Sequence, residues 1–157
     1  MCGGSHGLAL VVVTPQGETA PASIRIVPDE KLITEAEPNG GLRQAQSINA
    51  DHCTIRGAIG EDKDVDVYKV SGNAGQTLHA ETIAAAKGSA LDAAITVYDA
   101  RGNVLAADDD NSASPAHQDP LVELKLPADG DVFVVVTDVN DKGGAQTHPY
   151  LLSLSKQ

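Results

Sequence analysis

Short runs of alternating or β-branched residues, each closed by Gly, Pro, Asn or Asp, recur along this chain of 157 residues. Helical periodicity is almost absent, so no strand–helix–strand unit can be assembled. The runs recur about every 8–12 residues, the spacing of β-sandwiches and barrels. We therefore expect an all-β fold with strands at Leu8–Thr14, Ser23–Val27, Cys53–Ile59, Asp64–Val70, Gln76–Ala84, Leu91–Asp99, Val104–Ala107, Leu121–Leu126, Val132–Thr137 and Tyr150–Leu154.

The chain length suits one domain plus a fragment. The first two expected strands resemble a hairpin, and turn residues near Pro28–Leu32 mark the only candidate boundary. We expect residues 1–30 to be the tail of a preceding domain and residues 31–157 to be the sandwich. The start, Met1–Val13, has no basic segment and is predicted to be neither signal nor anchor. Weak periodicity at Leu42–Ile48 suggests one or two helical turns.

Charge and aromatic content exclude several classes of partner. The chain has 22 acidic and 11 basic residues, a net charge of −11, and only one Phe, three Tyr and no Trp. A surface that neutralises phosphates needs the opposite sign of charge, so we expect no binding to nucleic acid or anionic membrane. No apolar run approaches the roughly 18 residues of a membrane span.

The two cysteines, Cys2 and Cys53, allow at most one disulfide. Neither belongs to a CxxC pair, so a zinc or dithiol site has no support. A bridge could form in an oxidising compartment, but two inert thiols are the favoured interpretation.

The first acidic element is Glu35-Ala36-Glu37-Pro38-Asn39. Pro38 disfavours the helical conformation of Glu37, so this stretch should be extended. In an extended chain Glu35, Glu37 and Asn39 share one face, about 7 Å apart at each step. Carboxylates gathered in this way repel unless a cation lies among them. A hard cation that prefers oxygen meets that need, and the alternative is a solvated acidic loop.

The second acidic element is the strand Asp64–Val70. Strand parity places Asp64, Asp66, Tyr68 and Val70 on one face. We expect Tyr68 and Val70 to enter the core while Asp64 and Asp66 lie at its rim and contact a cation. The alternative is an edge strand protected from aggregation by its charges.

Other acidic runs give weaker signals. An EF-hand starting at Asp62 fails, because its sixth position would be Val67 rather than Gly and its twelfth Asn73 rather than Glu. A second acidic group, which could bind a weak second cation, is Asp108-Asp109-Asp110-Asn111 with Asp119. A third comprises Asp138, Asn140 and Asp141. For both groups a solvated loop is the favoured interpretation.

Sequence signatures of enzymes are missing. The chain has no G-x-S-x-G, H-E-x-x-H, G-x-G-x-x-G or Walker motif, and its five histidines lack ligand spacing. We therefore nominate no catalytic residue, although a triad built from distant loops stays an alternative.

Taken together, these motifs resemble the bacterial pre-peptidase C-terminal domain over roughly residues 33–157. The matching pieces are Glu35–Asn39, Gly57–Ile59, Asp64–Val70, Asn73–Gln76, Ser89–Asp99 with Gly102 and Leu105, Asp108-Asp109, Asp129–Asp131 and Tyr150–Leu152. The E-x-E-P-N element followed by a D-x-D-x-Y strand is the most specific part. Gly40 stands where many members have Asp, which removes one carboxylate.

The resemblance implies a jelly-roll-like antiparallel β-sandwich of about eight to ten strands, carried as a non-catalytic accessory domain by secreted, cell-surface or periplasmic bacterial proteins. Related collagen-binding domains of collagenases hold calcium with the equivalent acidic residues. Carried over by position, the calcium ligands would be Glu35, Glu37, Asn39, Asp64 and Asp66, with Asp62 a weaker addition. The expected partners are other domains of the same polypeptide. The alternative function is a module that binds an extracellular protein or glycan.

Overall fold

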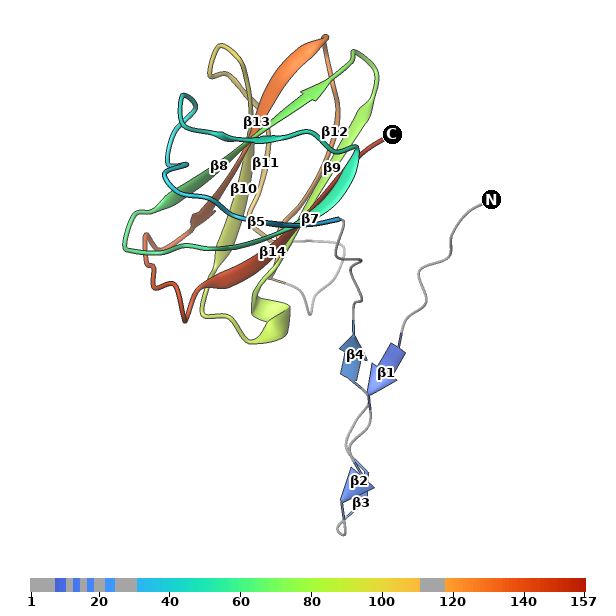
Figure 1. The fold of residues 1–157 in the computed structure, drawn as a ribbon, viewed down its shortest axis with the longest axis vertical. Helices are drawn as coiled ribbons and strands as arrows, with labels where there is room; N and C mark the ends of the chain where they lie inside the picture. Colours follow the sequence, from blue (N-terminus) through green and yellow to red (C-terminus); the bar gives the residue numbers. More distant parts are fainter. Residues whose placement is uncertain (1–7, 11–12, 15–16, 19–21, 25–30, 111–117) are drawn as a thin grey trace.

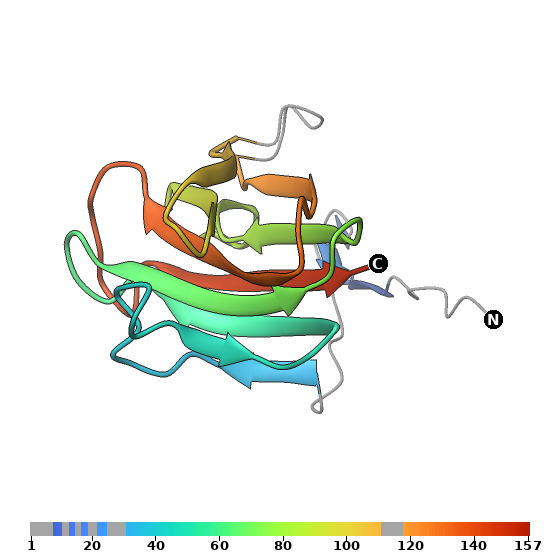
Figure 2. The ribbon, with the colours of Figure 1, turned by 90° about the horizontal axis from the view of Figure 1, so that it is seen from above.

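The computed structural model describes residues 8–10, 13–14, 17–18, 22–24, 31–110 and 118–157. From residue 31 onward, ten strands form two five-stranded sheets that pack face to face (Figures 1 and 2). Sheet I has the order β11 (Val104–Asp108), β10 (Ala93–Asp99), β13 (Gly130–Asp138), β8 (Val65–Gly72) and β6 (Gln46–Ile48). Sheet II has the order β12 (Leu121–Lys125), β9 (Thr77–Ile83), β14 (Pro149–Lys156), β7 (His52–Ala58) and β5 (Leu32–Thr34). The predicted all-β sandwich is confirmed.

The N-terminal strands form two short antiparallel pairs. β1 (Leu8–Leu10) pairs with β4 (Ala22–Ile24), and β2 (Val13–Thr14) pairs with β3 (Gly17–Glu18). This agrees with an expected hairpin at the start of the chain, and the rest of that hairpin lies outside the described residues. The proposed domain boundary near residue 30 stays a prediction.

Two pairings at the sheet edges are parallel, in sheets that we expected to be antiparallel throughout. β5 runs parallel to β7, and β6 runs parallel to β8. The helical turns expected at Leu42–Ile48 are wrong for Gln46–Ile48, which is a strand. Ile48 pairs with Val70 and is buried in the core, so tertiary packing overrides the weak helical pattern.

The core lies between the sheets and follows strand alternation. Ile95 and Val97 of β10 and Leu152 of β14 are among its fully buried members. The apolar run Val132–Thr137 is explained by two separate contacts. Its even-numbered valines enter the core, while Phe133 and Val135 pack with Val67 in a smaller cluster on the other face of sheet I.

Cys53 is a free thiol buried in β7. Burial raises the pKa of this thiol, which agrees with an inert packing residue. Cys2 lies outside the described residues.

A short 3-10 helix, η2 (Ala85–Lys87), precedes β10. No helix in the described part of the chain is long and apolar enough to cross a membrane.

Candidate metal centre

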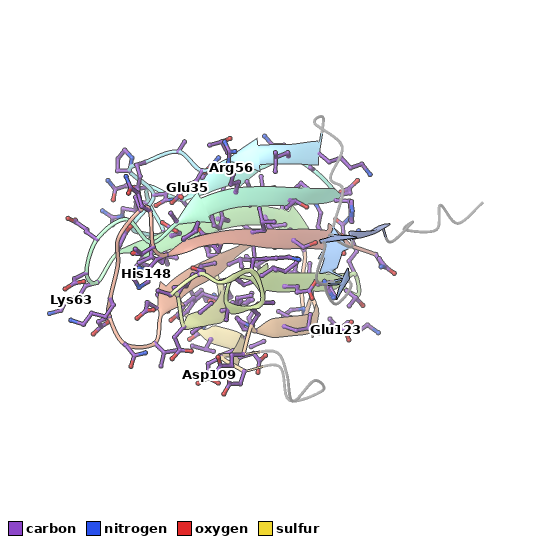
Figure 3. All side chains as sticks on the ribbon, turned by 90° about the horizontal axis from the view of Figure 1, so that it is seen from below. Glu35, Arg56, Lys63, Asp109, Glu123 and His148 are labelled. Atoms are coloured by element: carbon purple, nitrogen blue, oxygen red, sulfur yellow. The ribbon has the colours of Figure 1, made fainter. Side chains whose placement is uncertain are left out.

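The acidic segment 35–39 bridges the two sheets at one end of the sandwich. It continues from β5, and the Glu35 backbone N–H donates to the Arg56 carbonyl of β7 at 3.0 Å. At its other end, the Asn39 carbonyl accepts a hydrogen bond from the Val67 N–H of β8 at 3.2 Å. The Glu37–Pro38 peptide bond is cis. Glu35, Lys63 and His148 lie toward this end of the sandwich, whereas Glu123 lies toward the opposite end (Figure 3).

Asp66 lies beneath this segment on the inward face of β8. The predicted parity is confirmed, since Tyr68 and Val70 enter the core on the same face. The expected rim position of Asp66 is wrong, because its exposed fraction is 0%. The crossing segment 35–39 closes that end of the sandwich, and sequence periodicity could not reveal this cover.

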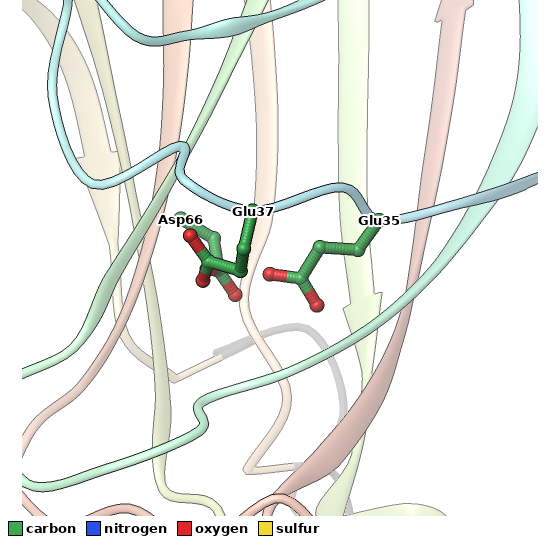
Figure 4. Close-up of side chains that lie close together, drawn as sticks. All are labelled: Glu35, Glu37 and Asp66. Carbon is green, nitrogen blue, oxygen red and sulfur yellow. The ribbon is translucent and has the colours of Figure 1, made fainter.

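Glu35, Glu37 and Asp66 converge. One carboxylate oxygen from each lies within 4.8 Å of the other two (Figure 4). Asn39 connects the glutamates, because its Nδ2 donates to Glu35 Oε1 at 3.2 Å and its backbone N–H donates to Glu37 Oε2 at 2.8 Å. Glu35 Oε2 also accepts the Ala58 N–H at 2.7 Å, which fixes its carboxylate against β7.

Two oxygens of this cluster have no hydrogen-bond partner. They are Asn39 Oδ1 and Asp66 Oδ1, and both residues are fully buried. A buried acceptor without a partner costs about 1–3 kcal/mol. An amide oxygen and three carboxylates form an all-oxygen donor set that suits a hard divalent cation. These residues therefore fit such an ion.

The electrostatics of the site also reflect crowded negative charge. Burial raises the pKa of Asp66 to about 9, together with the hydrogen bond that a proton shared with Glu35 would form and the nearby charges of Glu35 and Asp64. The hydrogen bond from Tyr150 opposes this shift. Burial also raises the pKa values of the hydroxyls of Tyr68 and Tyr150. Without a cation, the protonated form of Asp66 is therefore favoured at neutral pH.

Asp64 and Asp62 lie outside the group that converges. Asp64 Oδ2 accepts the Gly60 N–H at 2.7 Å, and its Oδ1 accepts the Val65 N–H at 2.9 Å. These bonds order the turn that leads into β8. Asp62 accepts the Gly143 N–H at 3.1 Å and lies 3.6 Å from the Lys142 ammonium. Both carboxylates hold loops together in this structure.

The other acidic groups also hold loops. Asp138 accepts the backbone N–H groups of Asp92, Asn140 and Lys142. Asp119 accepts the N–H groups of Ala85 and Ala86, where η2 begins. Backbone donors occupy these oxygens, which explains why both carboxylates are buried. Asn111 lies outside the described residues.

The sequence did not single out Tyr150 for the site. Its hydroxyl donates to Asp66 Oδ2 at 2.5 Å and lies 2.6 Å from the Tyr68 hydroxyl. The sequence predicted only that Tyr150 belongs to a strand, and the structure places it in β14 (Pro149–Lys156). Its role depends on the pairing of β14 with β7, which aligns Tyr150 with Gly57.

Gly57 provides the space in which Tyr150 and Glu35 approach each other. A Cβ at this position would lie 2.6 Å from the Tyr150 hydroxyl and 2.8 Å from Glu35 Oε2. We expect Gly57→Ala to destabilise the protein by about 1–2 kcal/mol through overpacking and to weaken any ion bound at the site. Thermal unfolding with and without calcium measures both effects. Gly41→Ala is the control, since the nearest atom to its Cβ would be 3.9 Å away, and equal behaviour of the two variants would contradict this expectation.

Comparison with known proteins relates part of the chain to a family. Residues 64–138 match the family described as the bacterial pre-peptidase C-terminal domain. Over 138 residues the chain is 32% identical to a probable subtilase-type serine protease of Deinococcus radiodurans, and the match covers 87% of this chain. The chain spans only 18% of the length of that relative.

Solved structures show the same fold at low sequence identity. The pre-peptidase C-terminal domain of a Bacillus anthracis collagenase superposes with a TM-score of 0.52 and 13% identity, over 78% of this chain and 100% of that one. A periplasmic inhibitor of g-type lysozyme from Aeromonas hydrophila superposes with a TM-score of 0.53 and 18% identity, over 81% and 98% of the two chains. The expected resemblance is therefore confirmed over residues 64–138, which match the bacterial pre-peptidase C-terminal domain family.

Proposed function

We propose that this sandwich is a non-catalytic accessory domain of a secreted bacterial protein, stabilised by one calcium ion at the cluster of Glu35, Glu37, Asn39 and Asp66. The observation that carries the proposal is the pair of unpartnered oxygens, Asn39 Oδ1 and Asp66 Oδ1, buried beside two glutamates. Calcium takes six to eight oxygen ligands in flexible geometry, which suits carboxylates and an amide oxygen from an irregular segment.

The ion would supply positive charge to a site that otherwise crowds three carboxylates. Glu35, Glu37 and Asn39 belong to the crossing segment, and Asp66 belongs to β8 of sheet I. A bound ion would therefore hold the segment on the sandwich and fix the direction from which the preceding chain arrives. This role suits an accessory domain that has to keep a defined position relative to its neighbours.

A location outside the cytoplasm agrees with the proposal. The relative from Deinococcus radiodurans is a probable subtilase-type serine protease, and one structural neighbour is named as periplasmic. Weak calcium sites of extracellular modules have dissociation constants of about 10⁻⁴–10⁻³ M. We infer that the parent polypeptide is protease-like and that this domain assists its targeting, folding or processing.

Calcium titration followed by thermal unfolding tests the proposal. A ligand that binds only the folded state stabilises it by about 2.7 kcal/mol at a hundredfold excess over Kd. We expect the wild-type melting temperature to rise with calcium and Glu37→Gln to lose most of this rise. Glu37 is exposed, so the exchange should leave the metal-free protein folded.

The matched control is Asp109→Asn, which removes an exposed carboxylate from the acidic group that begins at Asp108. This variant should respond to calcium as the wild type does. No rise in the wild-type protein would reject the calcium role and leave the alternative of a binding module. An equal loss in both variants would show that the effect depends on overall charge rather than on this site.

A further inference from the structure

The two oxygens of the Asp66 carboxylate differ in their contacts, because only one of them is hydrogen-bonded to Tyr150. Its hydroxyl donates to Asp66 Oδ2 at 2.5 Å, whereas Asp66 Oδ1 has no partner. We infer that Tyr150 is the positioning residue of the metal site, which holds Asp66 by Oδ2 so that Oδ1 is presented to the cation. This inference rests on the calcium site proposed above.

The direction of the hydrogen bonds supports this role. The Tyr150 hydroxyl has one proton, and the carboxylate accepts it. The Tyr68 hydroxyl, 2.6 Å from that of Tyr150, must then be the donor of their mutual bond. A directed chain runs from Tyr68 through Tyr150 to Asp66, and all three residues are buried. A charge-assisted bond at the end of such a chain fixes the rotation of the carboxylate and favours its ionised form.

The fold positions the tyrosine independently of the segment that would bind the ion. Tyr150 belongs to β14, which lies between β7 and β9 in the middle of sheet II. Its partner in register is Gly57, and the missing Cβ of that glycine leaves space for the hydroxyl. The tyrosine therefore reaches from sheet II to the Asp66 carboxylate on sheet I. The crossing segment 35–39 covers the other side of this carboxylate.

Groups that orient a metal ligand are part of the energetics of a site even though they do not touch the ion. Losing one typically weakens metal binding about 10–100-fold. In Tyr150→Phe the ring would remain and only the hydroxyl would be lost. Asp66 could then rotate or share a proton with Glu35 instead of presenting Oδ1. We expect the calcium Kd of this variant to increase by about 10–100-fold.

Calorimetric titration with calcium tests this inference on three variants that each lose one hydroxyl. Tyr150→Phe should show the largest loss of affinity. Tyr68→Phe should show a smaller loss, because it removes only the group that orients Tyr150. Tyr98→Phe is the control and should bind as the wild type does, since Tyr98 packs on the other face of sheet I.

Metal-free unfolding of each variant separates positioning from general destabilisation. A purely structural role for the Tyr150 hydroxyl would lower metal-free stability and leave the calcium Kd of the folded protein unchanged. If Tyr150→Phe does not fold, Tyr68→Phe decides, and an affinity equal to that of Tyr98→Phe overturns the inference. Wild-type protein that fails to bind calcium overturns the proposed function, whereas wild-type binding with an unchanged Kd in Tyr150→Phe overturns only the role of Tyr150.

Discussion

Asp66→Asn is expected to be more stable than the wild-type protein in chelator and to gain almost nothing from calcium. In the metal-free protein Asp66 lies fully buried beside two glutamates, with one oxygen unpartnered. An asparagine keeps an oxygen for the Tyr150 hydroxyl and presents an amide donor toward the glutamates. Because asparagine is neutral without binding a proton, the variant should be more stable by about 1–3 kcal/mol at neutral pH. Calcium should reverse the order, because the variant lacks one negative ligand and forgoes the stabilisation by the ion.

The pH dependence of the metal-free protein follows from the same residue. The pKa of Asp66 is about 9 in the folded protein, against 3.8 for an unperturbed aspartate. The folded state therefore binds a proton more tightly than the unfolded state does. The resulting stability is fully present below about pH 4 and is lost as the pH rises toward about 9. The difference between Asp66→Asn and the wild type should be smallest in acid and should increase with pH.

Denaturant unfolding at several pH values, in chelator and in excess calcium, measures these effects. The control is Asp109→Asn, which changes an exposed carboxylate outside the cluster. A metal-free Asp66→Asn protein that is less stable than the wild type at neutral pH would contradict the electrostatic argument. A full calcium response in this variant would contradict the assignment of Asp66 as a ligand.

Leu152→Ala should destabilise the protein by about 2–5 kcal/mol, with or without calcium. Leu152 is fully buried in β14, between Ile55 of β7 and Thr82 of β9. Its truncation would leave a cavity in the middle of sheet II, which the paired strands could fill only in part. Chemical denaturation in chelator gives the loss directly.

The control for this core substitution is Val104→Ala. Val104 is 58% exposed on the edge strand β11, and its truncation should change stability by less than about 0.5 kcal/mol. The calcium-dependent increment of Leu152→Ala should equal that of the wild type if the variant folds. Similar losses in both variants would show that the core is not packed as described.

Strand existence could be predicted from the sequence because it depends on local patterns. The β10–β11 hairpin and the apolar strand β13 follow from residue alternation and from turn residues such as Gly102 and Gly130. The parallel edge strands did not follow from such patterns, since the direction of pairing depends on contacts between distant segments. Ile48, for example, occupies β6 because the core beside Val70 accepts its side chain.

For the site, the sequence alone identified two oxygen-rich segments as candidate ligands: the run from Glu35 to Asn39 and the carboxylate strand that contains Asp66. The folded structure was needed to show that Asp66 is fully buried, that Asp64 accepts backbone N–H groups, and that Tyr150 donates to Asp66 from the facing sheet. The physical reason is that residue type and spacing fix the donor atoms and the face of a strand. Burial and hydrogen-bond partners depend on how β7, β8, β14 and the crossing segment 35–39 meet, which local pattern does not encode.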